Sequence, residues 1–220
     1  MLLEAPVFNL QASLEAAQLG IDRLELCANF PEGGETPSAG MLRFLKREID
    51  IPIFVMIRPR GGNFVYSPKE LLVMKQDIQL LGDLGADGFV FGALDAQGSV
   101  NESACESLLR AAESKPCTFH RAFDASADLT GSLEKIIQLG FHRVLTSGGE
   151  NSIEEGLPQV MALLEQAKER IIILPGGGLK VTHVSRLKES GYLKEVHASC
   201  KLAKPTDNQF VKSDLNFVGT

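Results

Sequence analysis

The sequence lacks the features of several protein classes. It has no long run of Lys and Arg, and its 22 basic residues are outnumbered by 28 acidic ones, for a formal net charge of -6. A surface that follows a phosphate backbone needs clustered positive charge, so nucleic acid is not expected as a partner. No apolar run is long enough to cross a bilayer, and no basic segment precedes an apolar one near Met1. We therefore expect a cytoplasmic protein without a membrane partner.

Cysteine is also scarce. The four cysteines lie far apart and form no Cys-x-x-Cys pair: Cys27, Cys105, Cys117 and Cys200. A chain of 220 residues with 44% hydrophobic residues can bury a sizeable core without disulfide bonds. We expect all four to be reduced thiols.

A recurring pattern organises the chain. At Gly20, Gly85, Gly140 and Gly191 a helical run ends in glycine and a β-rich run follows. Glycine suits the left-handed position that closes a helix, so each pattern marks a step from helix to strand. The intervals between these glycines fit two βα units each. Further strands are predicted within residues 2–8, 51–58, 116–121 and 170–175, which brings the count to eight.

Helical patterns lie between the predicted strands. Residues 68–83 show the clearest start, with Ser67 as N-cap, Pro68 at the first helical position and Glu70 completing a capping box. The other patterns cover residues 10–19, 39–49, 101–114, 130–139, 153–168 and 180–189. This alternation predicts a single-domain (β/α)8 TIM-type barrel, with an open Rossmann-like sheet as the alternative.

The two ends of the predicted barrel look irregular. Residues 201–220 contain Pro205 and no apolar periodicity, so a C-terminal tail is expected after residues 1–200, with the eighth helix missing or degenerate. Pro6 is expected to shorten or bulge the first strand. A flank without its helix would expose apolar surface, which a second subunit could cover, so we expect a homo-oligomer, specifically a dimer.

Chemistry in such a barrel belongs to the carboxyl ends of the strands. Side chains alternate along a strand, so Glu25 and Cys27 are expected to point into the barrel. His120 is a candidate general acid or base with Glu25 as the opposing carboxylate, and Asp124 is a third catalytic candidate. His120 as a metal ligand and His120 as a structural residue remain open alternatives.

The same end of the barrel offers anion-binding groups. Guanidinium groups suit carboxylate and phosphate, and glycine loops expose backbone N–H groups near helix N-termini. The candidates are Arg58, Arg60, Arg121, Ser147, Gly148, Gly149, Gly176, Gly177 and Gly178. The alternatives are that the glycines only form tight turns and that the arginines pair with Glu4, Glu25 or Asp124.

Metal ligands are few. Cys27 is the cysteine placed at the carboxyl end of a strand in the organised part of the chain, and His197 ends the last strand. Cys200 follows that strand, so it could approach Cys27. A thiolate with an imidazole suits a soft ion such as Cu(I), whereas a buried free cysteine is also common as a packing residue. His142 and His183 are expected to be structural.

Several long stretches resemble the CutC family. They are "DRLELCANFPEGGETPSAG" (22–40), "IPIFVMIRPRGGNFVYSPKEL" (51–71), "LGADGFVFGAL" (84–94), "TFHRAFD" (118–124), "LGFHRVLTSGG" (139–149) and "ILPGGG" (173–178). The resemblance implies a TIM-type barrel, a cytoplasmic location and a part in copper homeostasis, with Cys27 as the family's candidate copper-related cysteine. The second cysteine proposed for some relatives would fall within 41–50, where this chain has none.

Two functions are therefore carried forward. The first is a copper homeostasis protein that binds Cu(I) through Cys27 and His197. The second is a barrel enzyme, or a sensor, that acts on a small anionic or phosphorylated metabolite. Whether the chain catalyses a reaction is left open by its sequence.

Overall fold

The computed structural model describes residues 1–200, which form eight parallel strands alternating with seven α-helices. The strands are β1 (Leu2–Val7), β2 (Arg23–Leu26), β3 (Ile53–Met56), β4 (Gly88–Phe91), β5 (Cys117–Phe119), β6 (Arg143–Thr146), β7 (Ile172–Pro175) and β8 (Glu195–His197). The helices are α1 (Leu10–Gln18), α2 (Ala39–Glu48), α3 (Pro68–Asp83), α4 (Glu102–Ala111), α5 (Leu129–Leu139), α6 (Ile153–Ala167) and α7 (Val181–Leu187), with short 3-10 turns η1 (Phe30–Glu32) and η2 (Lys188–Ser190).

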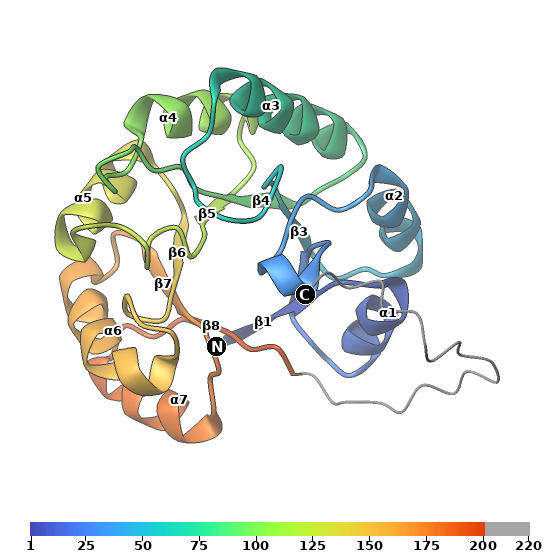
Figure 1. The fold of residues 1–220 in the computed structure, drawn as a ribbon. Helices are drawn as coiled ribbons and strands as arrows, with labels where there is room; N and C mark the ends of the chain where they lie inside the picture. Colours follow the sequence, from blue (N-terminus) through green and yellow to red (C-terminus); the bar gives the residue numbers. More distant parts are fainter. Residues whose placement is uncertain (201–220) are drawn as a thin grey trace, which may run out of the picture.

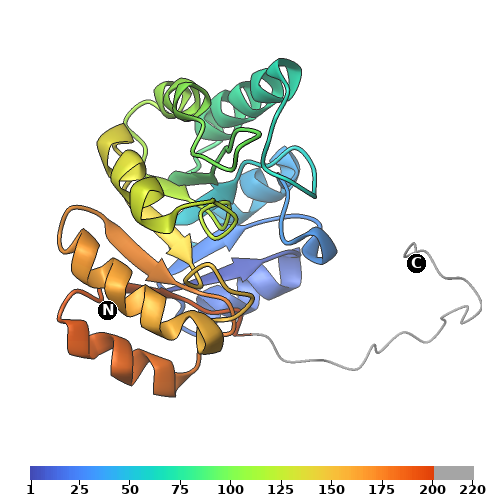
Figure 2. The same cartoon turned by 60° about the vertical axis from the view of Figure 1, so that its left-hand side comes forward.

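The strands form the inner ring and the helices the outer one (Figure 1). Sheet order runs β7-β6-β5-β4-β3-β2-β1-β8, and all pairs are parallel, as the common direction of the arrows in Figure 2 shows. The predicted (β/α)8 barrel is confirmed. The expected tail and the expected loss of the eighth helix concern residues 201–220, outside the described residues.

Local sequence signals explain the element boundaries. The Ser67 hydroxyl accepts a hydrogen bond from the Glu70 amide, and the Glu70 carboxylate accepts one from the Ser67 amide, so the predicted capping box is present at α3. Gly140 closes α5 with a φ of 87°, a left-handed conformation that other residues adopt at a cost. These caps place the strands that follow.

Pro6 does not shorten the first strand. β1 runs regularly for six residues, and Pro6 lies opposite Glu25 of β2. β8 pairs with β1 only from Leu2 to Glu4. Pro6 lies beyond this pairing, so its missing N–H removes no hydrogen bond between the two strands.

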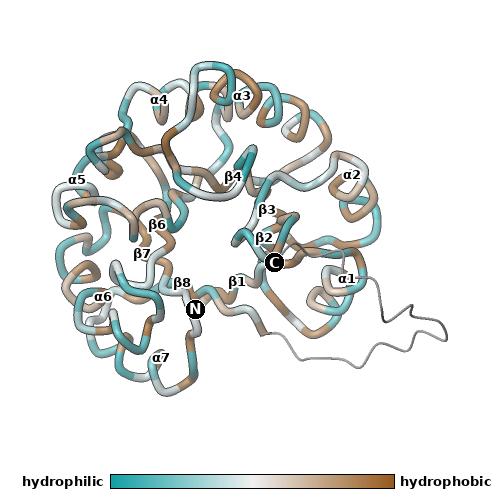
Figure 3. The backbone as a smooth tube through the Cα atoms, in the orientation of Figure 1, coloured by the Kyte–Doolittle hydropathy of each residue, from teal (hydrophilic) through white to brown (hydrophobic). Residues whose placement is uncertain are grey.

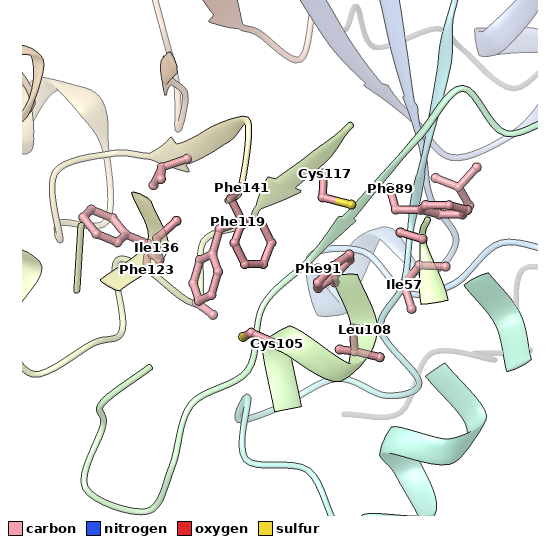
Figure 4. Packing of buried hydrophobic residues seen from close by; sticks show 14 of the residues in the cluster. Ile57, Phe89, Phe91, Cys105, Leu108, Cys117, Phe119, Phe123, Ile136 and Phe141 are labelled. Atoms are coloured by element: carbon pink, nitrogen blue, oxygen red, sulfur yellow. The ribbon is translucent and has the colours of Figure 1, made fainter. Parts of the chain in front are cut away.

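The main core fills the space between the ring of strands and the helices. In Figure 3 the helices alternate between hydrophobic and hydrophilic stretches, as expected when one face packs on the sheet. Aromatic rings of Phe91, Phe119 and Phe141 pack together there, with Cys105 and Cys117 among the same residues (Figure 4). Within residues 1–200, no helix combines the length and apolarity needed to cross a bilayer.

Candidate functional site

A polar cluster lies inside the barrel where β1, β2 and β8 meet. Glu4 of β1 lies in register with His197 of β8, and Oε1 of Glu4 is 2.9 Å from Nδ1 of His197. Glu25 of β2 places Oε2 3.9 Å from Nε2 of His197, and the Cys27 thiol donates a 3.7 Å hydrogen bond to the same oxygen. All four side chains are buried. The structure thus brings together the predicted residues Glu25, Cys27 and His197, and adds Glu4.

Burial is the largest influence on the pKa values of Glu25, Cys27 and His197. Desolvation raises the pKa of Glu25 to about 7, against the opposing charge of His197. Desolvation and the neighbouring Glu25 raise the pKa of the Cys27 thiol well above its ordinary value. Burial disfavours a charged His197, but Glu25 and Glu4 outweigh this and raise its pKa. The cluster therefore combines a protonated thiol with an imidazole held between two carboxylates.

The donor atoms of the cluster can converge on a cation. One ligand atom each from Glu4, Glu25 and His197 lies within 4.8 Å of the others. Glu4 engages Nδ1 of His197, which leaves Nε2 directed toward Glu25, the arrangement in which a carboxylate orients a ligating histidine. Oε1 of Glu25 is buried and has no hydrogen-bond partner in residues 1–200. Oxygen and nitrogen donors thus converge here, and the Cys27 thiol lies beside Glu25.

A buried ionic network supports the cluster from the amino ends of the strands. Arg23 donates to Glu4 and to Glu195 at 2.5 Å each, and Arg143 donates to Glu195 at 2.7 Å. Both guanidinium groups lie over the Phe54 ring, at 4.6 and 5.0 Å from its centroid. The network fixes Glu4, and therefore His197, in place.

Asp124 occupies the loop where an external anion was expected. Its carboxylate accepts hydrogen bonds from the amides of Ser147 and Gly149, at 3.1 and 2.9 Å, and from Nε of Arg121 at 2.7 Å. The Thr146 hydroxyl donates to it as well. An external anion at residues 147–149 would have to displace Asp124. The amides of Ser147 and Gly149 therefore already have an acceptor within the protein.

The second glycine loop is partly used by the backbone. The Gly176 amide donates to the Thr146 carbonyl at 2.9 Å, and the Gly177 carbonyl accepts from the Ile153 amide. A Cβ on Gly176 would lie 3.3 Å from the His197 ring, so glycine allows β7 to approach β8 closely. The expected anion-binding amides are thus reduced to those of Gly177 and Gly178, which have no acceptor in residues 1–200.

The two arginines after β3 do not pair with Glu4, Glu25 or Asp124. Arg58 donates to the carbonyls of Glu32, Gly34 and Gly62 at 2.6 to 2.9 Å. Arg60 donates to the Glu70 carboxylate at 2.6 Å. Both guanidinium groups therefore join loops at the rim, because backbone carbonyls and a helix-cap carboxylate lie closer than the interior acids. The Nε atom of Arg58 is buried without a partner in the described residues.

His120 is buried directly after β5. Its Nδ1 accepts from the Ala122 amide at 3.3 Å, and its ring packs against Phe64. Burial and the nearby Arg58 charge lower its pKa to about 3, so the ring is neutral at physiological pH. No hydrogen bond joins His120 to Glu25 within residues 1–200. Its Nε2 is buried and has no partner there.

The other cysteines and histidines lie apart from the cluster. Cys105 and Cys117 are buried among helix-facing core residues, and Cys200 is exposed while Cys27 is buried. His183 on α7 contacts Glu154 at 2.9 Å. His142 faces the start of β5, where its Nδ1 accepts from the Cys117 amide.

Comparisons with known proteins agree with the fold and with the motifs. The model of the CutC family matches residues 1–202. A human copper homeostasis protein cutC homolog is 45% identical over 97% of this chain and 78% of its own length. A CutC family protein of Bacteroides thetaiotaomicron is 39% identical over 96% of this chain and 86% of its own length.

Solved structures give the same assignment. The CutC structure from Streptococcus agalactiae superposes with a TM-score of 0.84 at 36% identity, covering 90% of this chain and 98% of that one. An aldolase, QR15, superposes with a TM-score of 0.66 at 14% identity over 90% of this chain and 89% of its own, and shows only that the barrel is shared. With eight parallel strands and seven helices in residues 1–200, the shared motifs and a family match over nearly all of its length, the chain belongs to the CutC family of copper homeostasis proteins.

Proposed function

We propose that the chain takes part in copper homeostasis by binding Cu(I) between Sγ of Cys27 and Nε2 of His197. One observation carries the proposal: Oε2 of Glu25 lies 3.7 Å from that sulfur and 3.9 Å from that nitrogen. The thiol and the imidazole thus lie beside the same carboxylate oxygen. Thiolate and imidazole are ligands that Cu(I) accepts, and the relatives named above are copper homeostasis proteins.

The arrangement also supplies a route for the thiol proton. A thiol binds a metal ion as thiolate, so the S–H bond must break as the S–Cu bond forms. Oε2 of Glu25 already accepts the hydrogen bond from Cys27 and is the nearest acceptor for that proton. Phe8, Phe54 and Val90 pack around the thiol, which keeps the site largely free of water.

An anaerobic Cu(I) competition titration with a chromophoric chelator tests this proposal. The unmodified protein should bind one ion, and Cys27→Ser should bind it about a hundredfold more weakly, since one of two principal ligands is lost. Cys105→Ser is the matched control, because Cys105 is also a buried free thiol but lies in the helix-facing core. Equal affinities for all three proteins would overturn the proposal.

A second candidate is an enzyme or a sensor for a small anionic metabolite. Nε2 of His120, Nε of Arg58 and Oε1 of Glu25 are buried without partners in residues 1–200, and buried polar atoms normally have one. A small polar ligand at the barrel mouth would satisfy them. Thermal stabilisation by small carboxylates or phosphate that is lost in His120→Gln would support this candidate, and equal stabilisation of both proteins would contradict it. Turnover of the ligand would distinguish an enzyme from a sensor.

Location and assembly are proposals as well. Three free cysteines are buried as thiols, which is consistent with a reducing cytoplasm. An apolar groove of about 880 Å³ beside α1 is lined by the exposed side chains of Leu19 and Phe30, and a second copy of the chain would cover it in a dimer. Light scattering after size exclusion should give a dimer mass, and a monomer mass would contradict this proposal.

A further inference from the structure

Met56 is a buried soft donor that the site described above leaves unused. It ends β3 with its side chain 4% exposed and directed to the inside of the barrel. It belongs to a small apolar cluster, separate from the main core, whose other buried members are Cys27, Phe54 and Val90. A thioether and a thiol therefore share one pocket on the inner face of the sheet.

Gly34 shows how close the two side chains lie. Gly34 follows η1 with a φ of 107°, and a Cβ built on it would be 3.4 Å from Sγ of Cys27 and 3.5 Å from Cε of Met56. The thiol and the end of the thioether thus face the same point beneath this loop. A residue with a side chain would be strained there and would fill the space between them.

The loop is held over the two side chains by Arg58. Nη1 of Arg58 donates to the Gly34 carbonyl at 2.9 Å and to the Glu32 carbonyl at 2.6 Å, both within one loop. The Gly34 amide in turn donates to the Asn29 carbonyl. Arg58 therefore fixes the position of the loop that closes the pocket, which gives a role to a guanidinium group first considered as an anion ligand.

We propose that the thioether of Met56 is a third ligand for Cu(I), together with Cys27 and His197. This inference rests on the proposed copper function. Thioether sulfur is a soft and neutral donor that binds Cu(I) and has little affinity for Zn(II) or for harder ions. Cys27, His197 and Glu25 alone would suit zinc as well, so Met56 is the residue that makes the site selective for Cu(I).

The test compares two buried methionines. Met56→Leu nearly conserves volume, and Met74→Leu is the matched control, since Met74 is fully buried on the core-facing side of α3. Cu(I) affinity should fall about tenfold in Met56→Leu and stay unchanged in Met74→Leu, because only one of them loses a ligand. Zn(II) affinity should be the same in all three proteins.

X-ray absorption at the selenium edge gives a direct second readout. Protein labelled with selenomethionine and loaded with Cu(I) should show selenium–copper scattering, which persists in Met74→Leu and vanishes in Met56→Leu. If Cys27→Ser weakens Cu(I) binding while Met56→Leu does not, and no such scattering is seen, Met56 is not a ligand but the copper proposal stands. If Cys27→Ser binds Cu(I) as tightly as the unmodified protein, the copper proposal itself fails, and this inference fails with it.

Discussion

Asp124 accepts hydrogen bonds from two loop amides, from the hydroxyls of Thr146 and Ser147, and from the guanidinium of Arg121. Groups of this kind bind phosphate in other barrels. In this protein the Asp124 carboxylate accepts the hydrogen bonds that a bound phosphate would accept. It thereby joins the loop after β5 to the loop after β6.

Replacing Asp124 should leave these donors unsatisfied. Asp124→Ala is expected to lower the free energy of unfolding by about 2–3 kcal/mol, a value reduced from that of a buried pair because Arg121 is 40% exposed. Urea denaturation measures the change. Glu150→Ala is the control, because Glu150 contributes only its backbone carbonyl to this loop, and it should change stability by less than about 0.5 kcal/mol.

Added phosphate extends that experiment. It should raise the melting temperature of Asp124→Ala by entering the vacated loop, and it should leave the unmodified protein unchanged. Stabilisation of the unmodified protein to the same extent would mean that phosphate binds at a site other than the loop that Asp124 occupies.

The sequence predicted the positions of some site residues and missed others. Alternation along β2 was sufficient to direct Glu25 and Cys27 into the barrel. Glu4 and Met56 were not predicted as site residues, because the partner of Glu4 lies 193 positions away and the neighbours of Met56 come from other strands. Asp124 was predicted as a catalytic candidate, and the sequence alone could not show that loop amides donate hydrogen bonds to it.

The elements themselves were predictable from local chemistry. The glycines that end helices, the capping box at α3 and the apolar runs of the strands each depend on residues close together in the chain. They can therefore be recognised in the sequence. The sequence near Pro6 could not show that this residue lies beyond the last pair between β1 and β8. That position depends on the length of β8 (Glu195–His197), which lies far along the chain.

The capping box at α3 gives a prediction at this scale. Ser67→Ala removes the acceptor for the Glu70 amide and should lower the free energy of unfolding by about 1 kcal/mol. Lys69→Ala, an exposed change in the same turn, should cost less than about 0.5 kcal/mol. Urea denaturation of both variants measures the difference, and equal losses would argue against the cap as the cause.

For the whole molecule, Glu195 links distant strands through the barrel interior. It lies on β8 and binds Arg23 of β2 and Arg143 of β6, so one carboxylate ties the last strand to both sides of the ring. Replacing it removes this partner from the buried Arg23, which keeps Glu4, and from Arg143, whose side chain is 12% exposed.

A pair of variants tests this link. Glu195→Leu should lower the free energy of unfolding by about 3–5 kcal/mol, because it leaves buried charge unpaired. The double change Glu195→Leu with Arg143→Met should cost less than the single one, because the unpaired Arg143 charge is also removed. Denaturant titration gives both values, and a larger loss in the double variant would contradict this account.

The pairing of β1 with β8 also has a consequence for synthesis. At about 5–20 residues per second, a ribosome needs roughly 10–40 s to reach His197 after Glu4 has been made. Until then the edge of β1 that later pairs with β8 is open, and an open strand edge can pair with another chain. Glu4 is translated early and its partner His197 late, so a nascent or prematurely released chain lacks the completed cluster and, on the proposed function, would not hold copper.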